Sequence, residues 1–342
     1  MSATVDLEWL ARICRLPGVS GSEGPVRDAV WERLRPLAHE AWIDPLGNLV
    51  LTRGWRDGRG PRTLLCAHLD EVGLIVTGVD PAGLLRFDLV GGIDVRLLPG
   101  CAVRIGPEGI PGAVTAVPVH LTPVAKRRQA AALEDLRLDI GARDAAQARR
   151  AVELGACAVF AGPAGPLGQL FRAKALDDRA GICVLAAALE ALADTGRPLA
   201  VAFTVQEEIG TRGAAAVADR LAPDQAVIVE TTTAVDLPGI PGRNQVTRLG
   251  RGPVLTALDG GMVAAPDLTA SLVAAAQQAG LAYQWKQAAS GGTDAARFQA
   301  SGARAAVVSV PARYLHAPAS VLDPRDLQGA ADLVAAWFRA GG

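Results

Sequence analysis

Four short apolar runs that are almost free of charged side chains constrain the fold of this chain more than any other feature. They span residues 63–67, 199–205, 226–229 and 305–310. Runs of this length that are rich in Val, Leu and Ala are typical of strands buried on both faces. Segments with helical patterning lie between and after them, at residues 180–193, 214–221, 264–278, 294–300 and 323–339. Strands that alternate with helices predict an α/β fold with a mostly parallel central sheet and helices on both faces.

Two helices are predicted before the first apolar run. The second begins near Ser20, with Glu23 three residues later, which is the pattern of a capping box. We therefore expect both side chains to serve the start of this helix.

The stretch from residue 73 to residue 165 breaks the α/β rhythm. It is dense in Gly and Pro and contains short alternating segments at residues 84–90, 101–106 and 112–117. That pattern favours a small β-rich barrel or sandwich, with one helix near residues 144–154. We predict an α/β domain formed by residues 1–72 and 166–342, into which residues 73–165 are inserted as a barrel-like domain.

The charge balance and the cysteines narrow the class of protein. The net charge is -1, whereas a surface that binds nucleic acid or an anionic membrane needs a clear basic excess. The five cysteines are scattered and form no C-x-x-C pair, which is typical of buried thiols in a reducing compartment. Asp6 and Glu8 stand where a signal peptide would be apolar, and Glu190 interrupts the best candidate for a membrane span, which begins at Ala180. We expect a soluble cytoplasmic protein.

Polar side chains follow each apolar run. In open α/β sheets, ligands bind in the crevice at the carboxyl ends of the strands. Two imidazoles and at least three carboxylates that meet in one crevice would repel one another without a cation, so they predict a metal site. The residues concerned are His68 and Asp70 after the first run, Glu207 and Glu208 after the second, Glu230 after the third, Arg313 and His316 after the fourth, and Asp177 and Asp178 before the helix at residue 180.

Each of these signals also has an ordinary structural interpretation. A His-x-Asp pair is common at strand ends, and an Asp pair before a helix serves as an N-cap. His316, taken alone, is more often structural, as we expect His39 and His120 to be. Adjacent carboxylates in an extended segment point to opposite faces, so one of Glu207 and Glu208 could bind metal while the other acts as a base. The shared sheet edge, rather than any single motif, carries the prediction.

Several motifs, in this order, resemble those of the tetrahedral aminopeptidases, which are also known as glutamyl or deblocking aminopeptidases and have carried glucanase labels. They are AHLDEVGLIV, KALDDRAG, FTVQEEIGTRGA, GGTDAARFQASG and PARYLHAP. The resemblance extends from residue 62 to the end of the chain. It implies a two-metal exopeptidase whose inserted β domain mediates dimerisation, and whose dimers assemble into hollow dodecamers that admit only peptides.

Carried over residue by residue, the resemblance implies a complete site. Glu207 would be the general base, and Asp70 would support His68. We further expect Gly292, Thr293, Asp294 and Arg313 to line the substrate pocket. The implied ligands are His68, Asp177 and Glu230 for one ion and Asp177, Glu208 and His316 for the other, with zinc, cobalt or manganese as the metal.

One position departs from the family pattern, and other functions stay open. Glu230 stands where the family commonly has Asp, with Asp236 as a less favoured alternative ligand. A metal-dependent carboxypeptidase or N-deacylase could use the same sheet. A glycosidase needs two opposed carboxylates but no histidines at the same edge. A non-catalytic metal-binding scaffold would have no reason to keep so costly an acidic cluster.

Overall fold

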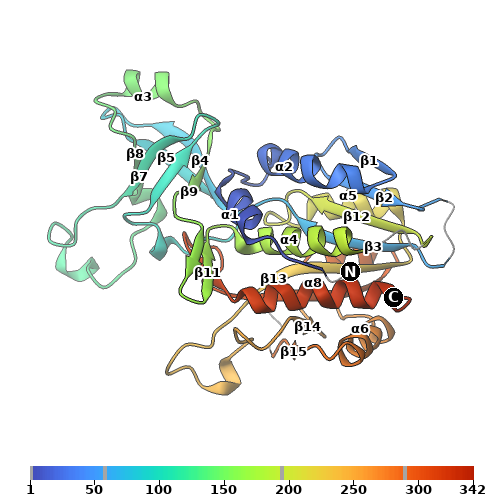
Figure 1. The fold of residues 1–342 in the computed structure, drawn as a ribbon. Coiled ribbons are helices and arrows are strands. Elements are labelled where there is room, and N and C mark those ends of the chain that lie inside the picture. Colours follow the sequence, from blue (N-terminus) through green and yellow to red (C-terminus); the bar gives the residue numbers. More distant parts are fainter. Residues whose placement is uncertain (1–2, 57–59, 193–195, 288–290) are drawn as a thin grey trace.

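The computed structural model describes residues 3–56, 60–192, 196–287 and 291–342, and a large sheet dominates it (Figure 1). The sheet has 11 strands in the order β1-β2-β12-β3-β13-β16-β17-β11-β10, with β14 on β16 and β15 on β14. The strands are β1 (Glu40–Ile43), β2 (Leu49–Arg53), β3 (Thr63–His68), β10 (Gly165–Leu167), β11 (Leu170–Ala173), β12 (Leu199–Thr204), β13 (Gln225–Thr233), β14 (Val254–Thr256), β15 (Gln284–Trp285), β16 (Arg304–Arg313) and β17 (Ser320–Leu322).

The four apolar runs of the sequence form neighbouring parallel strands in the middle of this sheet. They are β12, β3, β13 and β16, joined by parallel pairing. The strands β1, β2, β10, β11 and β17 pair antiparallel with their neighbours, so the sheet is mixed and the prediction of a mostly parallel sheet is not confirmed. The reason is that short loops connect the strands of the hairpins β1–β2 and β10–β11, and a short loop permits only antiparallel pairing.

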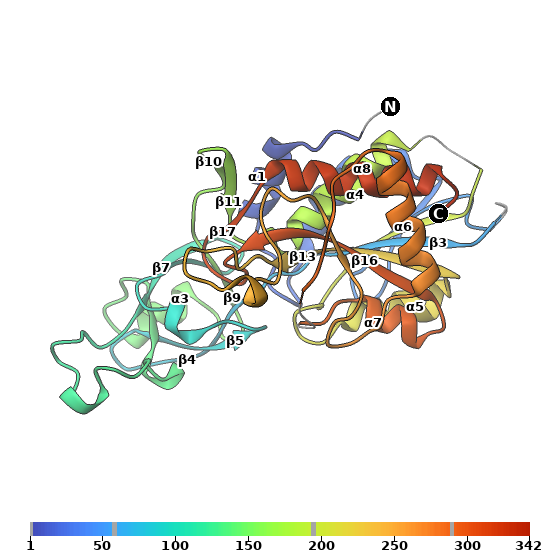
Figure 2. The same cartoon turned by 90° about the horizontal axis from the view of Figure 1, so that it is seen from below.

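Helices cover both faces of the sheet (Figure 2). Leu65 and Ala67 of β3 belong to the core under α1, α4, α6 and α8, whereas Leu64 and Cys66 belong to the core under α5 and α7. Because successive strand residues point to opposite faces, both faces of β3 are buried. The helices are α1 (Leu7–Arg15), α2 (Gly24–Leu34), α3 (Ala145–Ala151), α4 (Leu176–Ala191), α5 (Arg212–Leu221), α6 (Pro266–Gln278), α7 (Ala295–Ala300) and α8 (Pro324–Arg339), and the 3₁₀ turns are η1 (Arg35–Leu37), η2 (Val95–Leu97), η3 (Val124–Lys126), η4 (Leu133–Asp135) and η5 (Gly242–Asn244).

The segment between β3 and β10 forms a closed barrel at one side of the sheet (Figure 1). Its strand order is β4-β5-β8-β7-β6-β9, and every pairing is antiparallel. The barrel has its own apolar core, into which Ala148 of α3 packs. The strands are β4 (Gly73–Val79), β5 (Leu85–Val90), β6 (Ala102–Ile105), β7 (Ile110–Thr115), β8 (Arg137–Asp139) and β9 (Cys157–Phe160).

Two helix boundaries differ from the sequence prediction. The second helix, α2, begins at Gly24 rather than near Ser20, and the Glu23 side chain makes no capping hydrogen bond to it. Ser20 instead donates its hydroxyl to Oδ2 of Asp70 at 2.6 Å, so the capping-box prediction is wrong. The helix predicted over residues 180–193 begins earlier, at Leu176, and its predicted end at residue 193 lies outside the described residues.

None of the helices in the described part of the chain combines the length and the hydropathy needed to cross a membrane.

A buried ion cluster anchors α4 to the segment that follows β3. Nζ of Lys174 lies 2.6 Å from Oε1 of Glu71, and Nη2 of Arg179 lies 3.3 Å from the same oxygen. All three side chains are almost completely buried. Removal of the anion from such a cluster leaves two cations without their partner in a medium of low polarity.

We therefore expect Glu71→Ala to lower the free energy of unfolding by about 3–5 kcal/mol. Urea denaturation followed by circular dichroism measures this change. Glu32→Ala is the control, because Glu32 pairs with Arg12 on the surface, where both side chains are mostly exposed, and surface pairs contribute little. Equal urea midpoints for the two variants would contradict the assignment.

Candidate metal centre

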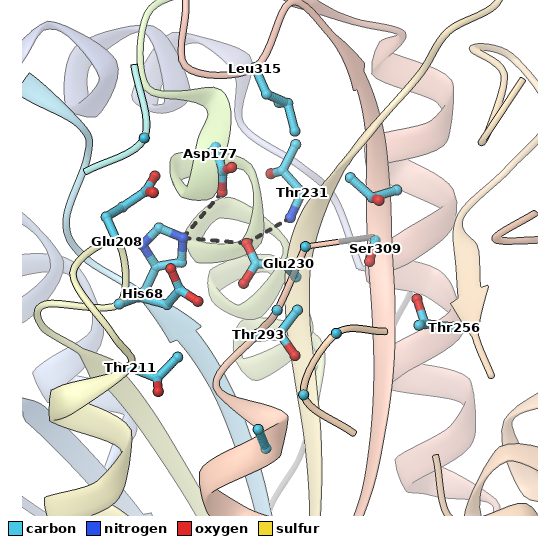
Figure 3. A pocket seen from close by; sticks show the side chains of 18 of the residues that line it. His68, Asp177, Glu208, Thr211, Glu230, Thr231, Thr256, Thr293, Ser309 and Leu315 are labelled. Atoms are coloured by element: carbon cyan, nitrogen blue, oxygen red, sulfur yellow. Dashed lines mark hydrogen bonds and ion pairs between the residues drawn. The ribbon is translucent and has the colours of Figure 1, made fainter. Parts of the chain in front are cut away.

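A cavity of about 830 Å³ opens at the carboxyl ends of the central strands (Figure 3). Eight of the predicted site residues line it, although they come from six separate parts of the chain. They are His68, Asp177, Glu207, Glu208, Glu230, Gly292, Thr293 and His316.

The first group in the cavity centres on His68, the last residue of β3. Its Nε2 lies 3.1 Å from Oδ1 of Asp177 and 3.3 Å from Oε1 of Glu230 (Figure 3). Glu230 projects from β13, and Asp177 lies at the first turn of α4, where its backbone is not helical. The neighbouring Asp178 accepts a hydrogen bond from the amide of Gly181 at 3.0 Å and so caps the helix, which leaves Asp177 to face the cavity.

The second group shares Asp177 with the first. Nε2 of His316 lies 3.1 Å from Oε1 of Glu208 and 3.4 Å from Oδ2 of Asp177. In each group, one candidate ligand atom from every residue lies within 4.8 Å of the others. Asp177 therefore presents one oxygen to each imidazole, and the two groups adjoin.

The far nitrogen of each imidazole has an oxygen neighbour. Nδ1 of His68 lies 3.4 Å from Oδ1 of Asp70, and Nδ1 of His316 lies 2.6 Å from the carbonyl oxygen of Gly92. This arrangement turns both Nε2 atoms toward the carboxylates and is typical of metal-binding histidines. Gly92 belongs to the loop after β5 of the barrel, and it was not predicted because a backbone carbonyl has no signature in the sequence.

Glu207 and Glu208 both line the cavity, contrary to the expectation that they would point to opposite faces. The strand β12 ends at Thr204, and Gln206 has a φ of 56°, so the chain is no longer extended at the pair. Asp70 accepts hydrogen bonds from the amides of Glu207 at 2.9 Å and Glu208 at 3.1 Å. Its carboxylate thus contacts both the His68 side of the site and the loop that carries the two glutamates.

Burial dominates the electrostatics of the carboxylates in the cluster. Burial raises the pKa of Glu207 to about 10 and that of Glu230 to about 8. Burial opposes the charge on His316, but Asp177 and Glu208 outweigh it and raise its pKa to about 11. These carboxylates can all ionise near neutral pH only if further positive charge lies among them.

The donor set fits divalent transition-metal ions. Each group offers one imidazole nitrogen and two carboxylates, which are ligands that zinc prefers. Oε1 of Glu208 is buried and faces His316 without a hydrogen bond in the part of the chain that the structure describes. A bound cation would give this oxygen a partner.

Two residues that we expected in the pocket do not line it. Asp294 is buried behind it, where it accepts a hydrogen bond from Oγ1 of Thr204 at 2.5 Å and where burial raises its pKa to about 6. Nε of Arg313 lies 2.6 Å from Oδ1 of Asp236, away from the lining. This pairing also takes up Asp236, the alternative ligand considered from the sequence.

Several cavity residues were not predicted. Lys286, which follows β15, and Arg297 of α7 bring positive charge to the wall. The hydroxyl groups of Thr256 and Ser309 come from β14 and β16. These residues carry no motif, and only the fold brings them to the cavity.

The chain matches a known family over most of its length. The model of the M42 glutamyl aminopeptidase family covers residues 47–333. Among curated relatives, a putative aminopeptidase from Acetivibrio thermocellus is 32% identical over 96% of this chain and 96% of its own.

Solved structures agree with this match. A TET aminopeptidase from a marine sediment archaeon of the Thaumarchaeota superposes with a TM-score of 0.92 at 31% identity, over 96% of this chain and 94% of its own. The TET1 peptidase of Pyrococcus horikoshii, described as able to assemble into a tetrahedron or a large octahedral shell, has a TM-score of 0.86 at 33% identity, over 96% of this chain and 98% of its own.

Proposed function

Because the chain belongs to the M42 glutamyl aminopeptidase family, we propose that it is a metal-dependent aminopeptidase that removes residues from the N-terminus of short peptides. The observation that most supports this activity is the pair of His-carboxylate groups that share Asp177 in one cavity beside Glu207. A cavity of about 830 Å³ is large enough for the first residues of a peptide.

Two divalent ions would be held by the two groups, with zinc as the first choice and cobalt or manganese as alternatives. Bound there, they would supply Lewis-acid polarisation of the scissile carbonyl and acidify a water molecule. His68, Asp177 and Glu230 form one ligand set, and Asp177, Glu208 and His316 form the other. Asp177 serves both, since its two oxygens face different imidazoles.

Glu207 is the proposed general base. Its carboxylate lines the cavity next to both ligand groups but belongs to neither. It takes a proton from the attacking water and passes that proton to the amine that leaves. Burial raises the pKa of Glu207, which makes its carboxylate a stronger base toward the attacking water.

A panel of substrates tests the activity. We expect the metal-loaded protein to hydrolyse aminoacyl-p-nitroanilides with a free amino group, and to leave N-acylated and C-terminal substrates of the same residues intact. A scan of N-terminal side chains identifies the preferred residue. Turnover of only the N-acylated substrates would establish a deacylase, and release of only C-terminal residues would establish a carboxypeptidase.

Asp70 is the proposed support of the metal ligands. We expect Asp70→Ala to weaken zinc binding by about 10–100-fold, because Asp70 contacts His68 and the amides of Glu207 and Glu208. Competition with a coloured chelator measures the affinity. Asp80→Ala, which removes an ion-paired carboxylate of the barrel, is the control, and equal losses in both variants would count against a role for Asp70.

We also propose that residues 73–165 form a dimerisation domain and that dimers can build a larger homo-oligomer. The loop after β7 exposes four large apolar side chains, at Val117, Val119, Leu121 and Val124, and such patches are typical of interaction surfaces. Light scattering of the purified protein distinguishes dimer from dodecamer. The five free cysteines support a reducing compartment such as the cytoplasm.

A further inference from the structure

The loop that carries the two cavity glutamates is held by buried side chains from three distant segments. Four consecutive backbone amides, those of residues 205–208, each donate to a side-chain oxygen. The pairs are Val205 with Oδ1 of Asn48 at 2.9 Å, Gln206 with Oε1 of Glu23 at 3.2 Å, Glu207 with Oδ1 of Asp70 at 2.9 Å, and Glu208 with Oδ2 of Asp70 at 3.1 Å.

Gln206 is the strained point of this loop. Its φ of 56° lies in the left-handed region, which costs free energy for any residue other than Gly. That conformation ends the extended geometry of β12, so Glu207 and Glu208 no longer alternate between faces and both line the cavity. A strained residue persists only where its surroundings hold it, and the side chain bonded to the Gln206 amide is Glu23.

Glu23 uses its carboxylate for this loop and not for its own helix. It occupies the N-cap position of α2 but makes no side-chain hydrogen bond to that helix. A single oxygen, Oε1, accepts from the amide of Gly21 at 2.7 Å and from that of Gln206 at 3.2 Å. The residue is only 5% exposed, and a carboxylate that serves only the end of a helix has no need of such costly burial.

We propose that Glu23 is a positioning residue: its carboxylate holds Gln206 in the left-handed conformation and thereby directs Glu207 into the cavity. The assignment rests on the proposed function, since Glu23 acts through the proposed general base. Glu23 lies more than 180 positions before Gln206 in the sequence. It also lies outside residues 47–333, the range that matches the family.

Four variants test the proposal. We expect Glu23→Ala to lower kcat by about 10–100-fold, since small misplacements of a catalytic group have effects of this size, with KM and metal content nearly unchanged. Glu23→Gln keeps an acceptor oxygen and retains most of the activity. Gln206→Gly places a residue that adopts positive φ without strain. The double variant Glu23→Ala/Gln206→Gly should therefore have a kcat several-fold higher than that of Glu23→Ala alone.

Asp326→Ala is the matched control. Asp326 is a buried carboxylate in the first turn of α8 that accepts from the amides of Gly250 at 2.6 Å and Gly252 at 2.7 Å, in a loop that does not line the cavity. Removal of the Asp326 carboxylate breaks two hydrogen bonds from backbone amides, as many as removal of the Glu23 carboxylate does. We expect a loss of thermal stability comparable to that of Glu23→Ala, with kcat unchanged.

Hydrogen exchange of residues 204–210 provides a measurement that does not depend on activity. We expect this segment to lose protection in Glu23→Ala and to keep it in Asp326→Ala. Unchanged protection, a wild-type kcat in Glu23→Ala, or a kcat loss that Gln206→Gly does not reduce would each overturn the proposal. If the wild-type protein had no activity on any substrate, the proposed function would be refuted instead. The hydrogen-exchange measurement would still decide whether Glu23 holds the loop.

Discussion

Glu207→Gln is expected to leave a folded, metal-binding protein whose kcat is lower by roughly 10²–10⁴-fold, the usual contribution of a general acid–base group. The amide has nearly the same shape as the carboxylate but cannot accept and return a proton. Because Glu207 belongs to neither ligand group, its metal content should stay at the wild-type level. Steady-state kinetics on an aminoacyl-p-nitroanilide, combined with elemental analysis of the same sample, measures both quantities.

Glu208→Gln is the informative comparison for this experiment. Glu208 faces His316 within one of the two ligand groups, so its variant should lose metal as well as activity. The two adjacent glutamates would then give different outcomes: Glu207→Gln would lose turnover but keep the metal, and Glu208→Gln would lose both. Wild-type turnover in Glu207→Gln would remove Glu207 from the role of base, and metal loss in that variant would make it a ligand.

Removal of the metal ions is the second large expected effect. Dialysis against a chelator should abolish turnover, and zinc, cobalt or manganese should restore it. The unfolding midpoint should fall at the same time, since a ligand present at 100 times its dissociation constant stabilises the native state by about 2.7 kcal/mol. Full activity in protein shown by elemental analysis to be metal-free would refute the mechanism.

Metal binding should also release protons. Burial raises the pKa of Glu230 to about 8 in the absence of metal, so this ligand carboxyl group holds a proton at neutral pH. An incoming cation competes with the protons on its ligands. The apparent affinity should therefore rise between pH 6 and pH 8. Calorimetric titrations in two buffers of different ionisation enthalpy measure the proton release, and its absence would contradict the assigned ligands.

The sequence by itself determined the central strands and the side chains at their ends. The runs at residues 63–67 and 226–229 fall within β3 and β13, because the lack of charge and the short length of a strand buried on both faces are local properties. His68 and Glu230, which follow these runs, also meet in one cavity, since the carboxyl ends of parallel strands share a sheet edge. Their roles in metal binding and catalysis remain predictions.

Only the tertiary structure decided how these side chains are held and which others join them. The strands β1, β2, β10, β11 and β17 pair antiparallel, Asp294 lies behind the cavity wall, and Arg313 pairs with Asp236. The support from Glu23 and from the carbonyl of Gly92 is equally invisible in the sequence. Such contacts join segments far apart in the chain, often through backbone atoms that every residue possesses. Local patterns of hydrophobicity and charge carry no information about them.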